Sequence, residues 1–121
     1  MFTDDSMPIF VKIKEKIKDD IMDGTYAADE LIISTTQIAK LFNVNPATAV
    51  KSVSMLQNEG IVYKKRGIGM CVAAGAKEKI CLERKAYFEE NALPQFVETA
   101  KKLGIDKNKL IAILSEVKDY D

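Results

Sequence analysis

The chain has 121 residues, of which 47% are hydrophobic and 30% charged, and it contains no histidine. This length allows one domain, or one domain with a small appendage, and the composition is ordinary for a globular protein. Without histidine, imidazole-based acid–base or nucleophilic catalysis is excluded, and a zinc site would lack its usual ligands. We therefore expect no enzyme activity, no metal ion and no cofactor.

The charge balance and the apolar runs indicate where the protein works. The 18 basic and 18 acidic residues give zero net charge, which does not decide about nucleic acid, because a local basic face matters more than the total. No apolar run approaches the roughly twenty residues of a membrane span, and residues 1–5 lack the start of a signal peptide. Cys71 and Cys81 are expected to be free thiols in a reducing compartment. These features predict a cytoplasmic protein without membrane contact.

The first predicted helix runs from Pro8 to Gly24, because proline suits a helix start and glycine a helix end. Apolar residues at every fourth position should face the core, namely Ile9, Ile13, Ile17 and Ile21. The charged residues among them should lie on the solvent side, namely Lys12, Lys14, Glu15, Lys16, Lys18, Asp19 and Asp20. The short apolar run at residues 31–33 then predicts a small strand.

Two short helices follow, joined by a tight turn. Residues 34–37 have the spacing of a capping box, in which Ser34 caps the helix and Gln37 reaches back. After the turn at residues 43–44, Asn45 and Pro46 start a second helix that Gly60 ends. Its inward stripe is predicted to be Ala49, Val50, Val53 and Leu56, and its outward face Ala47, Thr48, Lys51, Ser52 and Ser54. Such a pair of helices is typical of a helix-turn-helix.

A basic hairpin comes directly after this pair. Residues 61–63 and 70–72 read as two strands around residues 66–69, where Gly67 and Gly69 suit positive φ. The helix-turn-helix, about residues 34–59, and this hairpin, about residues 61–74, together predict a winged helix. The predicted fold class is α+β, mostly α: a winged helix-turn-helix domain at residues 8–75, followed by a small C-terminal helical dimerisation element at residues 76–121.

The residue types in this part of the chain suit DNA. Small polar residues at the start of the second helix allow close approach to a groove, and basic residues in the hairpin can neutralise phosphates. Each feature alone has an ordinary structural explanation, such as a helix start, a turn or a solvated strand edge, but their order and spacing together favour DNA binding. The candidate DNA-binding residues are Ser34, Thr35, Thr36, Asn45, Ala47, Thr48, Lys51, Lys64, Lys65, Arg66 and Gly67.

The last 46 or so residues return to a helical period, with Pro94 expected to interrupt a long helix and Asp106 to cap the last one. They are too few to enclose a drug-sized pocket. Their apolar stripe either packs back on the DNA-binding unit of the same chain or forms a twofold dimer. Paired half-sites favour the dimer, because two recognition helices must lie about 34 Å apart. The predicted interface includes Phe88, Leu93, Phe96 and Leu114.

The residues from Asn45 to Thr48, with Gly60 and the segment from Lys65 to Met70, resemble the GntR superfamily of bacterial transcriptional regulators, and more narrowly its short YtrA-like subfamily. The resemblance covers about residues 8–76 by motif. It implies that Ser34 and Thr48 meet phosphate, and that the wing tip at residues 66–67 enters the minor groove. It places at or near base edges Thr36, Asn45, Ala47 and Lys51.

The chain also departs from the wider family at three positions. Ile33 stands where many members have proline, and Thr36 and Val50 stand where many have arginine. Direct reading of guanine from those two positions is therefore lost, and Val50 is expected in the core.

The function predicted from these features is a sequence-specific transcriptional regulator, expected to be a repressor that binds a palindromic DNA operator as a homodimer. The resemblance implies that the regulated genes encode an ABC transporter. The alternative is a winged-helix protein-interaction module that does not bind DNA. The sequence does not identify a small-molecule effector.

Overall fold

The computed structural model describes residues 6–120, and the chain divides after Leu82 into two compact units. Residues 1–5, on which the signal-peptide prediction rests, lie outside this range. The elements in chain order are α1 (Ile9–Met22), α2 (Thr35–Leu41), α3 (Pro46–Asn58), β1 (Val62–Lys65), β2 (Gly69–Val72), α4 (Ala76–Tyr87), the π-helix η1 (Phe88–Ala92), α5 (Leu93–Lys102) and α6 (Lys107–Ser115). The fold is mostly helical α+β, as predicted. Within residues 6–120, no helix is long and apolar enough to cross a membrane.

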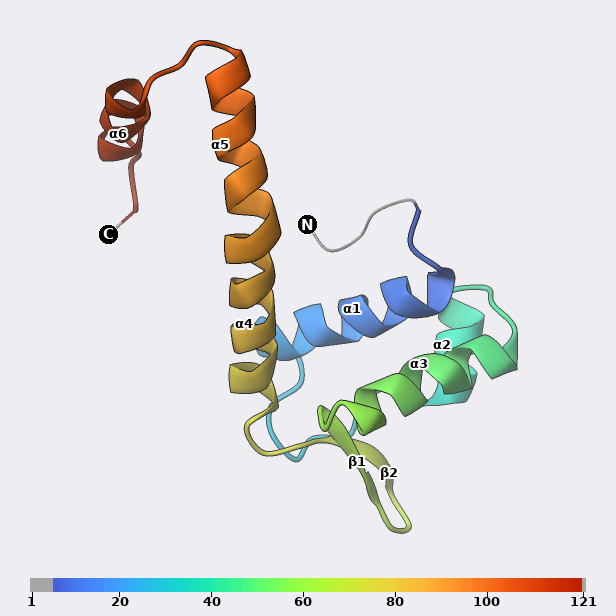
Figure 1. Ribbon diagram of the computed structural model, residues 1–121. Coiled ribbons are helices and arrows are strands. Elements are labelled where there is room, and N and C mark those ends of the chain that lie inside the picture. The colour runs from blue at the N-terminus through green and yellow to red at the C-terminus, as the bar shows by residue number, and fades with distance from the viewer. Residues whose placement is uncertain (1–5, 121) are drawn as a thin grey trace. The chain divides into compact units, whose positions relative to one another are not determined.

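The core of the first unit lies between α1, α2 and α3, and the hairpin β1–β2 extends away from these helices (Figure 1). Ile13, Ile17 and Ile21 of α1 are buried as expected, whereas Ile9 is 44% exposed. The start of α4 adds Ala76 and Ile80 to the same core. For this reason the first compact unit extends beyond residue 75, where the sequence suggested the division.

The helix-turn-helix forms with the predicted caps. Ser34 and Gln37 make a full capping box at the start of α2, and the turn between the helices contains Asn43 with a φ of 52°. Gly60, with a φ of 76°, follows the last residue of α3 and its C-cap Glu59. A Cβ at Gly60 would lie 2.6 Å from Lys79 Nζ, but this is the end of a flexible side chain that can move aside, so it is the positive φ that favours glycine here.

The wing is a two-stranded antiparallel sheet that pairs Val62 with Val72 and Lys65 with Gly69. The small strand predicted at residues 31–33 is reduced to an isolated bridge between Leu31 and Cys71. Backbone hydrogen bonds from Ile32 N to Met70 O at 2.9 Å and from Val72 N to Glu30 O at 2.9 Å still hold this segment against β2. Cys71 is buried and Cys81 exposed, and both are free thiols, as expected.

In the second unit, the helical run changes from π to α geometry directly before a proline. Pro94 lies in the first turn of α5, and it has no N–H to donate to a preceding carbonyl. The π-helical turn η1 ends directly before α5, and the Leu93 N–H, next to the proline, donates an i→i−5 hydrogen bond to the Phe88 carbonyl. Asp106 caps α6 by accepting a hydrogen bond from Lys109 N at 2.8 Å, as the sequence predicts.

The second unit buries little of its own apolar surface. Among its described residues, only Ala100 is buried. The four residues predicted at a dimer interface are 43–61% exposed, namely Phe88, Leu93, Phe96 and Leu114. A mostly apolar hollow of about 290 Å³ lies beside Val97, Ala100, Ile105 and Leu110.

A buried lysine links α1 to the end of α3 in the first unit. Lys18 is fully buried, and its Nζ lies 2.7 Å from Glu59 Oε1 and 3.4 Å from Glu15 Oε2. Lys14 Nζ approaches the other oxygen of Glu59 at 2.8 Å. The prediction that Lys18 and Glu15 face solvent was wrong. The periodic pattern of α1 does not show that the fold brings Glu59, at the end of α3, into contact with Lys18. The buried amine of Lys18 thus lies between the carboxylates of Glu15 and Glu59, which offset the cost of removing it from water.

The protonation of Glu59 couples this contact to pH. Burial opposes ionisation of the carboxyl group, but the hydrogen bonds from Lys14 and Lys18 outweigh burial and lower the pKa of Glu59 below its ordinary value of 4.5. The ionised carboxylate therefore stabilises the fold above about pH 4.5, and this contribution is lost as pH falls through the lowered pKa.

We expect Glu59→Gln to destabilise the protein by about 2–4 kcal/mol at pH 7, because the variant leaves the Lys18 ammonium without its closest carboxylate. The difference from wild type should shrink in acid, at a pH below the lowered pKa of Glu59, where the wild-type carboxylate is protonated. Urea unfolding followed by circular dichroism at both pH values measures this. Glu98→Gln, at an exposed position of α5, is the matched control. An equal loss of stability at both pH values would contradict the ion-pair explanation.

Candidate nucleic-acid interface

Helix α3 starts with a polar cap and small side chains. Asn45 is the N-cap residue, and its Oδ1 accepts a hydrogen bond from Ala47 N at 3.2 Å, with Pro46 as the first helical residue. The cap uses the oxygen of this exposed side chain, so its amide NH₂ remains as a donor for a phosphate or a base edge. Ala47 is exposed and Thr48 is half-buried. The first turn of α3 can therefore approach a groove closely.

The outward face of α3 differs from the predicted one at two positions. Val50 is 50% exposed, so its predicted place in the core was wrong, and Ser52, predicted outward, is fully buried. The 3.6-residue period explains both, because Ala49 and Leu56 set the inward direction, and position 52 lies nearer to it than position 50. The exposed residues of α3 are Pro46, Ala47, Val50, Lys51, Ser54, Gln57 and Asn58.

The first turn of α1 holds the middle of α3 through Phe10, an apolar residue of the first helix whose contact with α3 the sequence did not indicate. Ser52 Oγ lies 3.0 Å from the Phe10 carbonyl oxygen and 3.1 Å from the Thr48 carbonyl oxygen, to either of which it can donate. Lys51 Nζ lies over the Phe10 ring, 3.9 Å from its centroid. The Lys51 ammonium therefore rests on an aromatic face, where a cation–π contact holds it beside the first turn of α1.

The start of α2 presents hydroxyl groups, one of which is already used. Ser34 Oγ accepts a hydrogen bond from Gln37 N at 3.1 Å, while Ser34 N donates to Gln37 Oε1 at 3.0 Å. The Ser34 hydroxyl can still donate its own hydrogen to an anion. Thr35 is half-buried and Thr36 is exposed. A hollow of about 120 Å³ is lined by both Ser34 and Thr35 and by Ile68 and Gly69 of the wing, so these two parts of the candidate interface adjoin.

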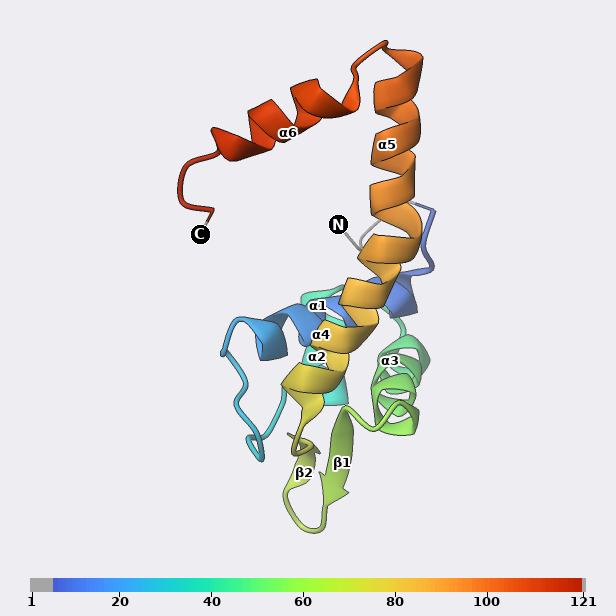
Figure 2. The same cartoon turned by 60° about the vertical axis from the view of Figure 1, so that its left-hand side comes forward.

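The tip of the wing is a tight turn that carries Arg66 and Gly67. Ile68 N donates to Lys65 O at 3.0 Å, and Gly67 has a φ of 79°. Positive φ at this position favours glycine. The tip points away from the three helices of the first unit in Figures 1 and 2. Lys64 and Arg66 are exposed, and within residues 6–120 neither forms an ion pair.

Lys65 differs from its two neighbours. It is half-buried, and its Nζ forms an ion pair with Asp29 Oδ2 at 3.1 Å. Asp29 also accepts a hydrogen bond from the Tyr63 hydroxyl, and its backbone N donates to Val72 O at 2.8 Å. The alternation of a strand explains the difference, because Tyr63 and Lys65 share one face of β1 and Lys64 lies on the other. The basic triplet predicted for DNA thus contains two available cations and one that already has a partner.

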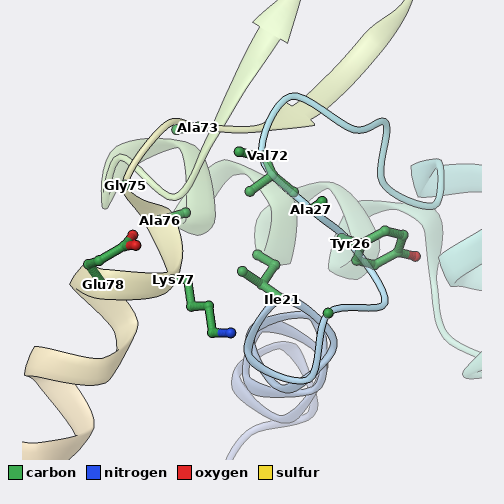
Figure 3. A pocket seen from close by; sticks show the side chains of 11 residues that line it. Ile21, Tyr26, Ala27, Val72, Ala73, Gly75, Ala76, Lys77 and Glu78 are labelled. Carbon is green, nitrogen blue, oxygen red and sulfur yellow. The ribbon is translucent and has the colours of Figure 1, made fainter.

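One further hollow of the first unit lies away from these residues (Figure 3). It has a volume of about 280 Å³ and is lined mainly by apolar groups, among them Ile21, Val72 and Ala76. Lys77 extends from α4 toward Ile21. Both Lys77 and Glu78 at its edge are exposed, so this hollow offers no buried charge to a ligand.

The model of the bacterial regulatory proteins of the gntR family matches residues 10–72, which is more than half of the chain. The uncharacterized HTH-type transcriptional regulator YhcF of Bacillus subtilis is 28% identical over 106 residues, which are 88% of this chain and 86% of that protein. The arabinose metabolism transcriptional repressor of Halalkalibacterium halodurans is 26% identical over 118 residues. These cover 90% of this chain but 32% of the repressor, so the chain spans about a third of that relative.

Solved structures agree with the family match. A GntR family transcriptional regulator from Listeria monocytogenes has a TM-score of 0.70 and 29% identity, over 96% of this chain and all of that chain. The AraR DNA-binding domain in complex with operator ORR3 has a TM-score of 0.54 and 26% identity, over 60% of this chain and 88% of that chain. The chain therefore belongs to the GntR family and is a DNA-binding transcriptional regulator with a winged helix-turn-helix.

Proposed function

We propose that this regulator binds a palindromic operator as a homodimer, represses transcription and belongs to the short YtrA-like subfamily. The observation that carries the DNA-reading part is the pairing of a small, polar first turn on α3 with two exposed cations, Lys64 and Arg66, at the wing tip. A recognition helix contacts base edges with its N-terminal residues, and flanking cations fix its register on the phosphates. The contacts with DNA are made by the candidate residues at the start of α2, in the first turns of α3 and in the wing. Lys65 contributes less than Lys64 and Arg66, because it already pairs with Asp29.

The homodimer is supported by the exposed apolar side chains of the second unit. Phe88, Leu93, Phe96 and Leu114 remain 43–61% exposed, and large exposed apolar side chains gathered in one small unit are typical of an interaction site. A second copy is the occupant that best fits a palindromic operator, because a twofold axis places two recognition helices on two half-sites.

Repression and the regulated genes rest on similarity. The arabinose relative is named a repressor, and the AraR domain is bound to an operator. By resemblance to the YtrA-like subfamily, the regulated genes would encode an ABC transporter.

Selection from a random pool of duplex DNA tests this function. We expect the full chain to enrich a palindrome whose half-sites are about one helical turn apart, since the recognition helices of a dimer must enter successive major grooves. In a reconstituted transcription assay, the protein should lower output from a promoter that overlaps the selected site. Failure to enrich any symmetric sequence would favour the winged-helix protein-interaction module over an operator-binding regulator.

The wing should contribute mainly to the salt dependence of binding. We expect Lys64→Ala and Arg66→Ala each to reduce the slope of log affinity against log salt by about 1.8, because a homodimer of either variant loses two phosphate contacts and each contributes about 0.9. Lys65→Ala should change the slope less, because Asp29 already holds that ammonium. Fluorescence anisotropy at several salt concentrations measures the slopes. Equal slope changes for Lys64→Ala and Lys65→Ala would contradict the assignment of the two lysines.

A charge placed in the apolar surface of the second unit should disrupt the proposed homodimer. We expect Phe96→Asp to sediment as a monomer at micromolar concentration and to bind the full operator about 10²–10⁴ times more weakly, because the second half-site is then bound independently. Gln95→Asp introduces the same charge at the neighbouring exposed position and should remain a dimer. A dimer of unchanged stability in Phe96→Asp would place the interface elsewhere.

A further inference from the structure

Val50 is an apolar residue in the part of α3 that a recognition helix uses for bases. It is 50% exposed, and it lies between Ala47 and Ser54 on the outward stripe of the helix. Single exposed valines are common on protein surfaces, so its position carries the argument. It lies five residues after the cap Asn45, within the turns of a recognition helix that reach base edges.

Two structural reasons for a valine at this position are absent. Val50 is not part of the buried core, which takes Ala49, Val53 and Leu56 from the same helix. It does not serve helix formation either, because a β-branched residue is a weaker helix former than alanine, lysine or glutamine. The neighbouring cation does not cover it, since the Lys51 ammonium rests on the Phe10 ring.

The chemistry of the major groove suggests what Val50 contacts. Base edges in that groove present hydrogen-bonding groups with one apolar exception, the 5-methyl group of thymine. Valine offers two methyl groups and no hydrogen-bonding group, and a small residue such as Ala47 one turn earlier lets the helix come close. We propose that Val50 selects thymine in each half-site through contact with its 5-methyl group. The proposal rests on the operator binding proposed above.

Replacing thymine by deoxyuridine removes only that methyl group, so a double-mutant cycle isolates the contact. Each thymine of the selected half-site is replaced in turn, symmetrically in both half-sites, and affinity is measured for the wild-type chain and for Val50→Ala. Burying one methyl group corresponds to about a fourfold change in affinity, so about tenfold or more is expected for the two half-sites together. Deoxyuridine at one thymine position should cause this loss of affinity for the wild-type chain. The same replacement should cause no loss of affinity for Val50→Ala.

The control is Val117→Ala, which makes the same chemical change at an exposed valine after α6 and should keep the full deoxyuridine effect. A further selection with Val50→Ala should lose the preference for thymine at the affected position only. An undiminished deoxyuridine effect in Val50→Ala, or no effect at any thymine in wild type, would overturn the proposal while leaving operator binding intact. If wild type selects no operator at all, the proposed function fails first and this inference with it.

Discussion

The contact between the Lys18 ammonium and the Glu59 carboxylate is the constraint on which the first unit depends. The ammonium is fully buried, and the two charged groups lie 2.7 Å apart. An unpaired ammonium in such a place would be far too costly to keep charged. The pairing therefore favours the docking of α1 against the end of α3 that keeps these groups in contact. Hydrophobic contacts alone tolerate small sliding of one helix along another, whereas an ion pair with two lysines on one carboxylate does not.

The position of Glu59 in the chain makes this contact important for DNA reading. Glu59 is the C-cap of α3, and Gly60 and Ile61 lead directly from it into the wing. Its backbone carbonyl also accepts a hydrogen bond from Lys79 Nζ at 3.2 Å. One anchor thus sets the end of the recognition helix, the start of the wing and the start of α4. At the middle of α3, the contact of Ser52 with the Phe10 carbonyl supplies a second anchor to α1. Two anchors on one helix fix both its tilt and its rotation, which decides which side chains face outward.

On the outward face of α3, the sides assigned from residue type differ from those that the tertiary structure shows. Val50 and Ser52 were assigned to the wrong sides, because valine suits a core and serine suits solvent when each is judged by its type alone. Ser52 is buried because a carbonyl on another helix accepts its hydroxyl, and Val50 is exposed because α3 is rotated to place Ala49 and Val53 inward. The same limit applies to Lys65, whose partner Asp29 is remote in sequence but lies beside β1 in the fold. The helical spacing from Ala49 to Leu56 would have placed Val50 and Ser52 on the correct sides of α3. No local sequence pattern indicates that Asp29 pairs with Lys65 or that Glu59 pairs with Lys18.

By itself, the sequence determined several element ends: the capping box at Ser34, the Asn45–Pro46 start, the stop at Gly60, the hairpin turn at Gly67 and the cap at Asp106. These are decided within a few residues, by φ preferences and by side chains that bond to their own backbone, so they can be read locally. Only the tertiary structure decided which charges are buried, which cations remain available for phosphate and which side of α3 faces outward. Those outcomes depend on partners that are 36 to 45 residues away along the chain, and folding alone brings such groups within hydrogen-bonding distance.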